Sequence, residues 1–116
     1  MDKNFDTSNP VLLETINLLQ EQDAPVWSSV AENLGKVNRQ RAEVNLSDIE
    51  RVAEDGETVV VPGKVLGSGR LTKDVDVAAF KASNGAKNQI NEDNEFMFIQ
   101  DLVDENPEGE NVRLVK

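Results

Sequence analysis

The segment TVVVPGKVLGSG, residues 58–69, constrains the fold of this 116-residue chain more than any other segment. Residues 58–61 are all β-branched, which is typical of a buried strand. Pro62-Gly63 is expected to interrupt that strand, because proline has no N–H to donate to a neighbouring strand. Gly63, Gly67 and Gly69 fall within seven residues, which indicates a backbone that bends sharply or approaches another group closely. We therefore predict a buried strand over residues 58–61, followed by a glycine-rich segment.

Apolar residues at helical spacing predict two helices at the start of the chain. Asn9-Pro10 provides an N-cap and a first-turn proline for a helix over residues 10–22. A second apolar stripe covers residues 26–34, and Gly35 is expected to end it in the left-handed conformation. Trp27, the only tryptophan, lies on this stripe and is interpreted as a core residue rather than a platform on which a base stacks.

Shorter elements alternate along the rest of the chain. Ser47 is expected to cap a helix over residues 48–54, and Ser83 to begin another short helix. In residues 74–79, Val75, Val77 and Ala79 alternate with positions expected to face solvent. This pattern predicts a strand with one solvated face. A last amphipathic helix is predicted from Phe98, Ile99, Leu102 and Val103, followed by a closing strand through Val112, Leu114 and Val115. We predict a mixed α/β fold in a single compact domain over residues 1–116, with residues 1–8 flexible.

The composition excludes several function classes. The chain has no cysteine and no histidine, so disulfides, thiolate zinc sites and the commonest general base are excluded. No apolar run approaches the roughly 20 residues that a membrane-spanning helix needs, and the N-terminus lacks a signal-peptide profile. We expect a cytoplasmic protein that is not an enzyme, with no cofactor, membrane partner or small-molecule substrate.

Positive charge is concentrated in two windows of an otherwise acidic chain. The sequence has 12 Lys and Arg residues against 22 Asp and Glu residues, a formal net charge of −10. Residues 35–42 contain Lys36, Arg39 and Arg41 but no acid, and residues 58–73 contain Lys64, Arg70 and Lys73 but no acid. A surface that binds a polyanion needs such local positive potential. Asn38 and Gln40 beside the two arginines favour phosphate and ribose contacts, although these cations could instead neutralise neighbouring acids.

Two further constellations have both a functional and a purely structural interpretation. A nucleotide-binding loop needs Gly-Lys-Ser/Thr at the start of a helix, whereas Lys64 is followed by Val65. Backbone N–H groups, the Ser68 hydroxyl and the flanking Lys64 and Arg70 suit an RNA phosphate backbone better, and a structural turn is the alternative. Asp74 and Asp76 could hold a hard cation, but a solvated strand face is favoured because no further ligand is recognisable.

Longer runs resemble a known family. RAEVNLSDIER (residues 41–51) and TVVVPGKVLGSGRLTKDVDVAA (residues 58–79) resemble the L18e family of archaeal and eukaryotic large-subunit ribosomal proteins, the sister family of bacterial L15. NPVLLETINLL, VWSSVAENL and NPEGENVRLVK are also similar, so the resemblance covers nearly the whole chain. The acidic balance resembles the halophilic archaeal branch.

The resemblance implies an irregular superhelical core of β-β-α units wrapped by N-terminal helices. It also implies a structural role on the ribosome, with large-subunit ribosomal RNA and neighbouring ribosomal proteins as partners. By matching positions, it implies RNA contacts at Arg39, Arg41 and Asn45, and at Lys64, Ser68, Gly69 and Lys73. Together with Lys36 and Arg70 from the basic windows, these residues form the predicted RNA-binding set. The family usually has a basic residue where this chain has Asp48, so fewer phosphate contacts are expected near the first window.

Two other functions stay open at this point. The chain could be a free acidic module that binds another protein through its helices and never joins a ribosome. It could also be a metal-dependent or hydrolytic enzyme that uses Asp74 and Asp76. The lack of histidine and of further recognisable ligands disfavours the enzyme, and the basic windows favour the RNA-binding protein.

Overall fold

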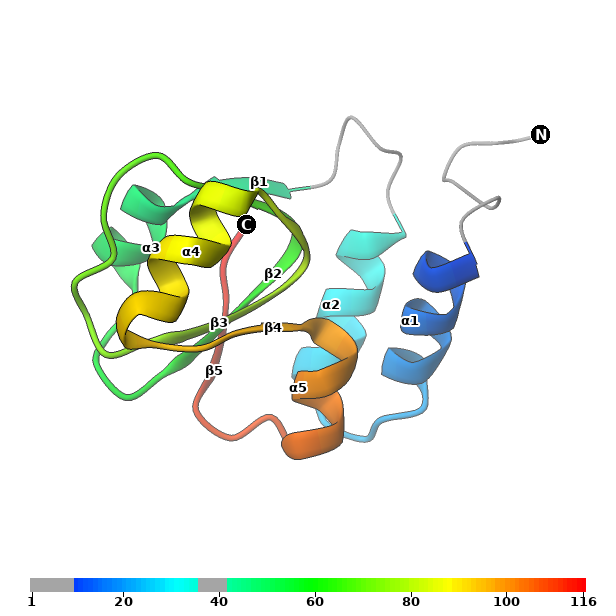
Figure 1. The fold of residues 1–116 in the computed structure, drawn as a ribbon. Helices are drawn as coiled ribbons and strands as arrows, with labels where there is room; N and C mark the ends of the chain where they lie inside the picture. The colour runs from blue at the N-terminus through cyan, green and yellow to red at the C-terminus, as the bar shows by residue number, and fades with distance from the viewer. Residues whose placement is uncertain (1–9, 36–41) are drawn as a thin grey trace.

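The computed structural model describes residues 10–35 and 42–116 (Figure 1). These residues form five helices and five strands that are interspersed along the chain, which confirms the mixed α/β fold class. The elements are α1 (Pro10–Gln20), α2 (Pro25–Leu34), β1 (Ala42–Asn45), α3 (Leu46–Val52), β2 (Thr58–Leu66), β3 (Asp76–Ala82), α4 (Asn84–Asp93), β4 (Phe96–Phe98), α5 (Ile99–Glu105) and β5 (Val112–Leu114). The predicted flexible segment 1–8 and the predicted Asn9 cap lie outside the described residues. No helix in the described ranges is long and apolar enough to cross a membrane.

Strand β2 is the centre of a parallel sheet. The strand order is β1-β2-β3-β4, and β5 also pairs with β2. Residues 63–66 of β2 pair with β1, residues 58–60 pair with β5, and β3 pairs along the other edge. Because both edges of β2 are paired, its apolar run lies in the middle of the sheet. Val59, Val60 and Val61 are fully buried, which confirms the predicted buried strand.

The prediction that Pro62-Gly63 interrupts this strand was wrong. Strand β2 continues to Leu66, and its register against β3 shifts between Val61 and Lys64. Such an irregularity accommodates a proline that lacks an N–H. Gly63 contributes by letting β1 come close, since a Cβ atom there would lie 2.1 Å from the carbonyl oxygen of Ala42.

Helices cover both faces of the sheet (Figure 1). One core cluster joins Val59 and Val61 to Ile49 of α3 and Ile90 of α4. The other core cluster joins apolar residues of α1, α2 and α5 to Val60, Ala78 and Phe80. The second face of β3 is therefore buried rather than solvated as predicted, because a sheet with parallel strands is usually covered on both sides.

The structure corrects several predicted helix ends. Helix α1 ends at Gln20, before the predicted residue 22. Gly35 follows α2 with φ −74°, so it is right-handed and the left-handed prediction was wrong. Helix α3 is capped by Asn45, not Ser47, in a capping box with Asp48, whose carboxylate accepts the Asn45 N–H at 3.0 Å.

Predictions near the C-terminus were partly confirmed. Ser83 caps α4 by accepting the Ala86 N–H at 3.2 Å, as expected. The closing strand is β5. Phe98, however, belongs to β4 rather than to the last helix, which begins at Ile99. The apolar spacing could not separate the two elements because the strand is only three residues long.

Candidate nucleic-acid interface

Two exposed lysines lie side by side at the carboxyl end of the sheet. Parallel strands end at the same edge, so the residues that close β2 and β3 lie together there. Lys64 on β2 is the register partner of Lys81 on β3, and both side chains are exposed. Arg70 is exposed on the loop that leaves β2 at this end. We call Lys64, Arg70 and Lys81 the cationic edge.

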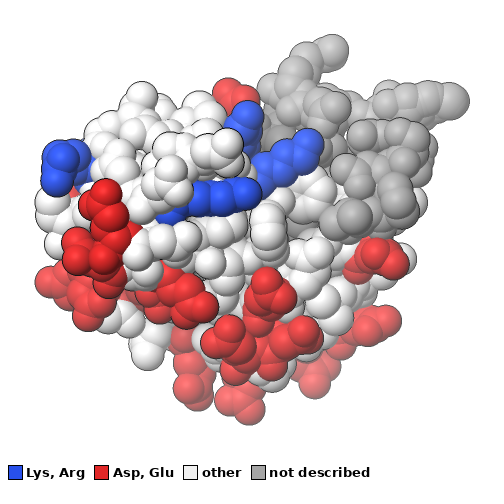
Figure 2. Space-filling view, in the orientation of Figure 1, with Lys and Arg blue, Asp and Glu red and all other residues white. Residues whose placement is uncertain are grey.

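The cations of the cationic edge are not neutralised by described acids, and the Lys81 ammonium lies 5.9 Å from the centroid of the Phe80 ring. Within the described residues, none of its three side chains forms an ion pair, although Glu43 is the register partner of Lys64 on β1. By contrast, Arg51 pairs with Asp48 at 3.2 Å and Arg113 with Glu57 at 2.7 Å. Figure 2 shows most carboxylates of this face gathered in the lower half, away from the lysines and arginines in the upper half. An acidic chain thus presents a separate positive surface.

Lys81 was not predicted from the sequence. It lies beyond both acid-free windows, because Asp74 and Asp76 separate it from Lys73. Only the register of β2 against β3 places it beside Lys64. The sequence carried no local signal for this residue.

The glycine loop is shaped by the protein itself. Gly69 has φ +93°, and a Cβ atom there would lie 2.6 Å from the Cβ of Ser47. The Gln89 amide donates to the carbonyls of Gly67 at 3.2 Å and Gly69 at 3.1 Å. The Ser47 N–H donates to the Ser68 carbonyl at 3.1 Å. The structural-turn interpretation therefore accounts for these glycines, while the side chain of Ser68 and the backbone of Gly69 remain exposed.

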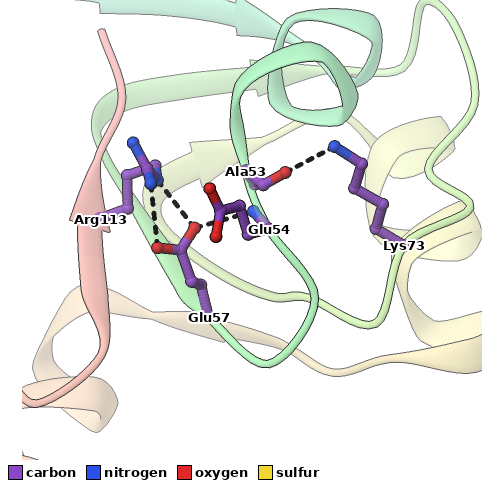
Figure 3. A network of polar contacts seen from close by, with 5 residues as sticks. All are labelled: Ala53, Glu54, Glu57, Lys73 and Arg113. Carbon is purple, nitrogen blue, oxygen red and sulfur yellow. Dashed lines mark hydrogen bonds and ion pairs between the residues drawn. The ribbon is translucent and has the colours of Figure 1, made fainter.

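Lys73 lies further along the loop that carries Arg70, shortly before β3, and Figure 3 shows its contact. Its ammonium donates to the carbonyl oxygen of Ala53, the C-cap residue of α3, at 2.6 Å. Nearby, Glu57 accepts two hydrogen bonds from Arg113, at 2.7 and 3.1 Å. These bonds lower the pKa of Glu57 and raise the pKa of Arg113. The structure thus gives Lys73 an intramolecular partner at the far end of the loop.

Glu50 holds the loop that connects β2 to β3. Its carboxylate accepts hydrogen bonds from the Thr72 N–H at 2.9 Å, from the Lys73 N–H at 3.3 Å and from the Thr72 hydroxyl. The Thr72 hydroxyl and N–H bonds lower the pKa of Glu50 below its ordinary value of 4.5. Sequence reasoning missed this residue, because Glu50 and Thr72 are far apart in a chain with many acids.

We predict that Glu50→Gln flattens the acid side of the stability profile. A carboxyl group with a lowered folded-state pKa stabilises the fold above its ordinary pKa, and this contribution is lost as pH falls through the folded value. Urea midpoints of wild type should therefore decline more steeply below about pH 4.5 than those of the variant. Glu92→Gln, at an exposed position on α4, is the control and should keep the wild-type slope. Parallel profiles for wild type and Glu50→Gln would contradict the assignment.

The remaining predicted residues take different positions. Lys36, Arg39 and Arg41 lie outside the described residues. Asn45 is half-buried at the start of α3, where it caps the helix.

Asp74 and Asp76 both form hydrogen bonds with other segments of the chain, Asp76 through its carboxylate and Asp74 through its backbone N–H. The Asp76 carboxylate accepts the Glu95 N–H at 2.9 Å, and the Asp74 N–H donates to the Asp55 carboxylate at 2.8 Å. In the described part of the chain, no group of three or more acids could hold a metal ion.

Comparison with known proteins identifies the class and then the family. Residues 33–93 match a family of ribosomal proteins whose description names the 50S proteins L15 and L18e together with their 60S counterpart. "Large ribosomal subunit protein eL18" of Archaeoglobus fulgidus is 50% identical over 113 residues, which cover 93% of this chain and 97% of the relative. The eL18 proteins of Haloarcula marismortui and Halobacterium salinarum are each 42% identical, over 116 and 117 residues, and cover both chains completely.

These matches define a ribosomal protein. The chain belongs to the eL18 family, as the resemblance predicted. Two of the relatives come from Haloarcula and Halobacterium, which agrees with the halophilic archaeal type expected from the acidic composition.

Proposed function

We propose that this chain is a structural, non-catalytic constituent of the large ribosomal subunit in the cytoplasm, where it binds ribosomal RNA and neighbouring ribosomal proteins. The names of its eL18 relatives support the assignment to the large ribosomal subunit. The observation that carries the RNA-binding role is the cationic edge, which is exposed and free of ion pairs within the described residues of a chain with net charge −10. The predicted contacts at Lys36, Arg39, Arg41, Asn45, Ser68, Gly69 and Lys73 belong to the same proposal.

The sheet supplies a rigid support for these contacts. Lys64 and Lys81 project from adjacent strands in register, about 4.8 Å apart, so both ammonium groups can reach neighbouring phosphate oxygens of one RNA strand. Less ordering is needed on binding when such groups are already positioned. The start of α4 lies next to Gly67 and adds the partial positive charge of a helix N-terminus.

The salt concentration determines which interactions can bind an acidic protein to RNA. At about 1 M salt the screening length is about 3 Å, so repulsion between the distant carboxylates and the RNA backbone is largely removed. Salt also weakens simple phosphate contacts. Binding must then depend on close hydrogen bonds and on shape, including contacts to 2′-hydroxyl groups. Ser68 is exposed, and its hydroxyl is chemically suited to such contacts.

The RNA-binding role is tested by neutralising the cationic edge. Each charge-assisted hydrogen bond contributes about 1.5–3 kcal/mol, so Lys64→Gln with Lys81→Gln should weaken binding to large-subunit ribosomal RNA about 100-fold or more. The control, Gln20→Glu with Ser28→Glu, lowers the net charge equally at exposed positions on α1 and α2. Filter binding of the full chain at moderate and at high salt measures both. Equal affinity of the two double variants would contradict a specific contact.

Sedimentation tests the subunit assignment separately. Native extract is run on a gradient in potassium and magnesium salts, and mass spectrometry locates the chain. We expect near-stoichiometric amounts in the large-subunit peak, resistant to a high-salt wash. Presence only in light fractions would favour the free interaction module instead.

A further inference from the structure

An open groove follows the edge strand β4 and the helix α5 that continues from it. Its volume is about 470 Å³. It combines an apolar floor with a rim of carboxylates, and its lining residues are Glu95, Phe96, Met97, Phe98, Asp101, Asp104 and Glu105. We call this feature the acidic groove. The RNA-binding proposal makes no use of it.

Phe98 gives the acidic groove an apolar contact surface. Its side chain is 42% exposed, and Val52 is the only other large apolar residue of the described chain with comparable exposure. The ring is held in place: Phe96 packs edge-on at 5.3 Å between centroids, and the Lys87 ammonium lies 5.5 Å from the Phe98 centroid. An aromatic ring that is fixed yet exposed is typical of interaction surfaces. The same ammonium lies 6.0 Å from the Phe96 centroid, within the range of cation–π contacts for both rings.

The rim of the acidic groove carries unneutralised negative charge. Asp101, Asp104 and Glu105 are spaced i, i+3 and i+4, so they share one face of α5, and Glu95 joins them from the start of β4. All four are exposed, and none forms an ion pair with another described residue. Like charges at this spacing destabilise a helix. A cationic partner would relieve that repulsion.

We infer that the acidic groove binds a cationic segment of another protein, an extended arginine- and lysine-rich stretch with an arginine against Phe98. The four carboxylates select positive charge and repel RNA phosphates. The exposed ring suits a planar guanidinium, which stacks on aromatic faces better than an ammonium does. A second copy of this chain is disfavoured because each copy carries a net charge of −10. Figure 2 shows most acids of the drawn face below its lysines and arginines.

Peptide binding to the full-length chain tests this inference. The probe is a fluorescent twelve-residue peptide of alternating arginine and serine, and its lysine counterpart has the same charge. We expect the arginine peptide to bind more tightly to wild type. Phe98→Ala, and separately Asp101→Asn with Asp104→Asn, should each weaken its binding about 10-fold. Phe98→Leu keeps an apolar side chain but should lose the preference for arginine over lysine.

A matched control separates the acidic groove from general attraction to an acidic protein. Glu21→Gln with Asp23→Asn removes two exposed acids from the turn between α1 and α2 and should leave peptide affinity at the wild-type value. Equal weakening by this control, or full affinity after Phe98→Ala, would overturn the inference. Concentration-dependent dimerisation lost on Phe98→Ala would overturn it in favour of a second copy. Weaker ribosomal RNA binding by Phe98→Ala would overturn it in favour of RNA, while the Lys64 and Lys81 variants test the cationic edge independently.

Discussion

Replacement of Gly63 with alanine is expected to disrupt the centre of the sheet. The new Cβ atom would lie 2.1 Å from the carbonyl oxygen and 2.9 Å from the carbonyl carbon of Ala42. Both are backbone atoms of the neighbouring strand β1, so relief requires β1 to move away from β2 rather than a side chain to rotate. Such overpacking costs about 3 kcal/mol or more, a large part of the roughly 5–15 kcal/mol that stabilises a small domain. Urea unfolding followed by circular dichroism measures the loss.

Gly85 provides the matched control for this substitution. It lies in the first turn of α4, and no atom beyond its immediate surroundings would come within 4 Å of an added Cβ. Alanine is the better helix former by about 1 kcal/mol, so Gly85→Ala should be as stable as wild type or slightly more stable. If Gly63→Ala unfolded at the same urea concentration as Gly85→Ala, the close contact between β1 and β2 would be refuted.

The second large effect is expected at Trp27. Its side chain is fully buried in the cluster between the sheet and α1, α2 and α5. Its indole N–H donates to the Pro107 carbonyl at 2.8 Å, which connects α2 to the segment before β5. Gly109 lies against the same helix, since a Cβ atom there would be 2.6 Å from a methyl carbon of Val26. Trp27→Ala removes both the packing and the hydrogen bond and should cost about 3–5 kcal/mol.

Trp27→Phe separates these two contributions. Phenylalanine keeps most of the apolar contact but leaves the Pro107 carbonyl without its indole donor, a loss of about 1–3 kcal/mol. Urea unfolding by circular dichroism compares the variants, because both lack the tryptophan fluorescence of wild type. The expected order of stability is wild type, then Trp27→Phe, then Trp27→Ala. A midpoint for Trp27→Ala close to wild type would show that the indole is not a core anchor.

The candidate site was predictable in part. The second basic window was visible in the sequence, and Lys64 and Arg70 are exposed at the carboxyl end of the sheet. Lys73 came from the same window, yet its ammonium contacts the Ala53 carbonyl near the start of β3. Charge counting cannot separate these cases, because the loop between β2 and β3 runs the length of the sheet. Only the register between β2 and β3 places Lys81 beside Lys64, so the sequence alone could not identify it.

Local patterns in the sequence determined what depends on neighbouring residues. The β-branched run of β2, the apolar stripe with Trp27, the Ser83 cap and the uneven charge each reflect interactions over a few positions, and the structure agrees with the first three. The longer runs were enough to indicate the family. None of these signals required knowledge of the pairing between distant segments.

The tertiary structure decided what depends on segments far apart in the chain. Strand β2 continues through Pro62-Gly63 because β1 and β3 pair with the residues that follow. The ladder with β1 in turn requires a glycine beside Ala42. Glu50 holds Thr72 across 22 positions, and β3 is buried on both faces because α3 and α4 cover one face and α1, α2 and α5 cover the other. The physical reason is the same throughout: these contacts arise from register and layer packing, which local sequence patterns do not encode.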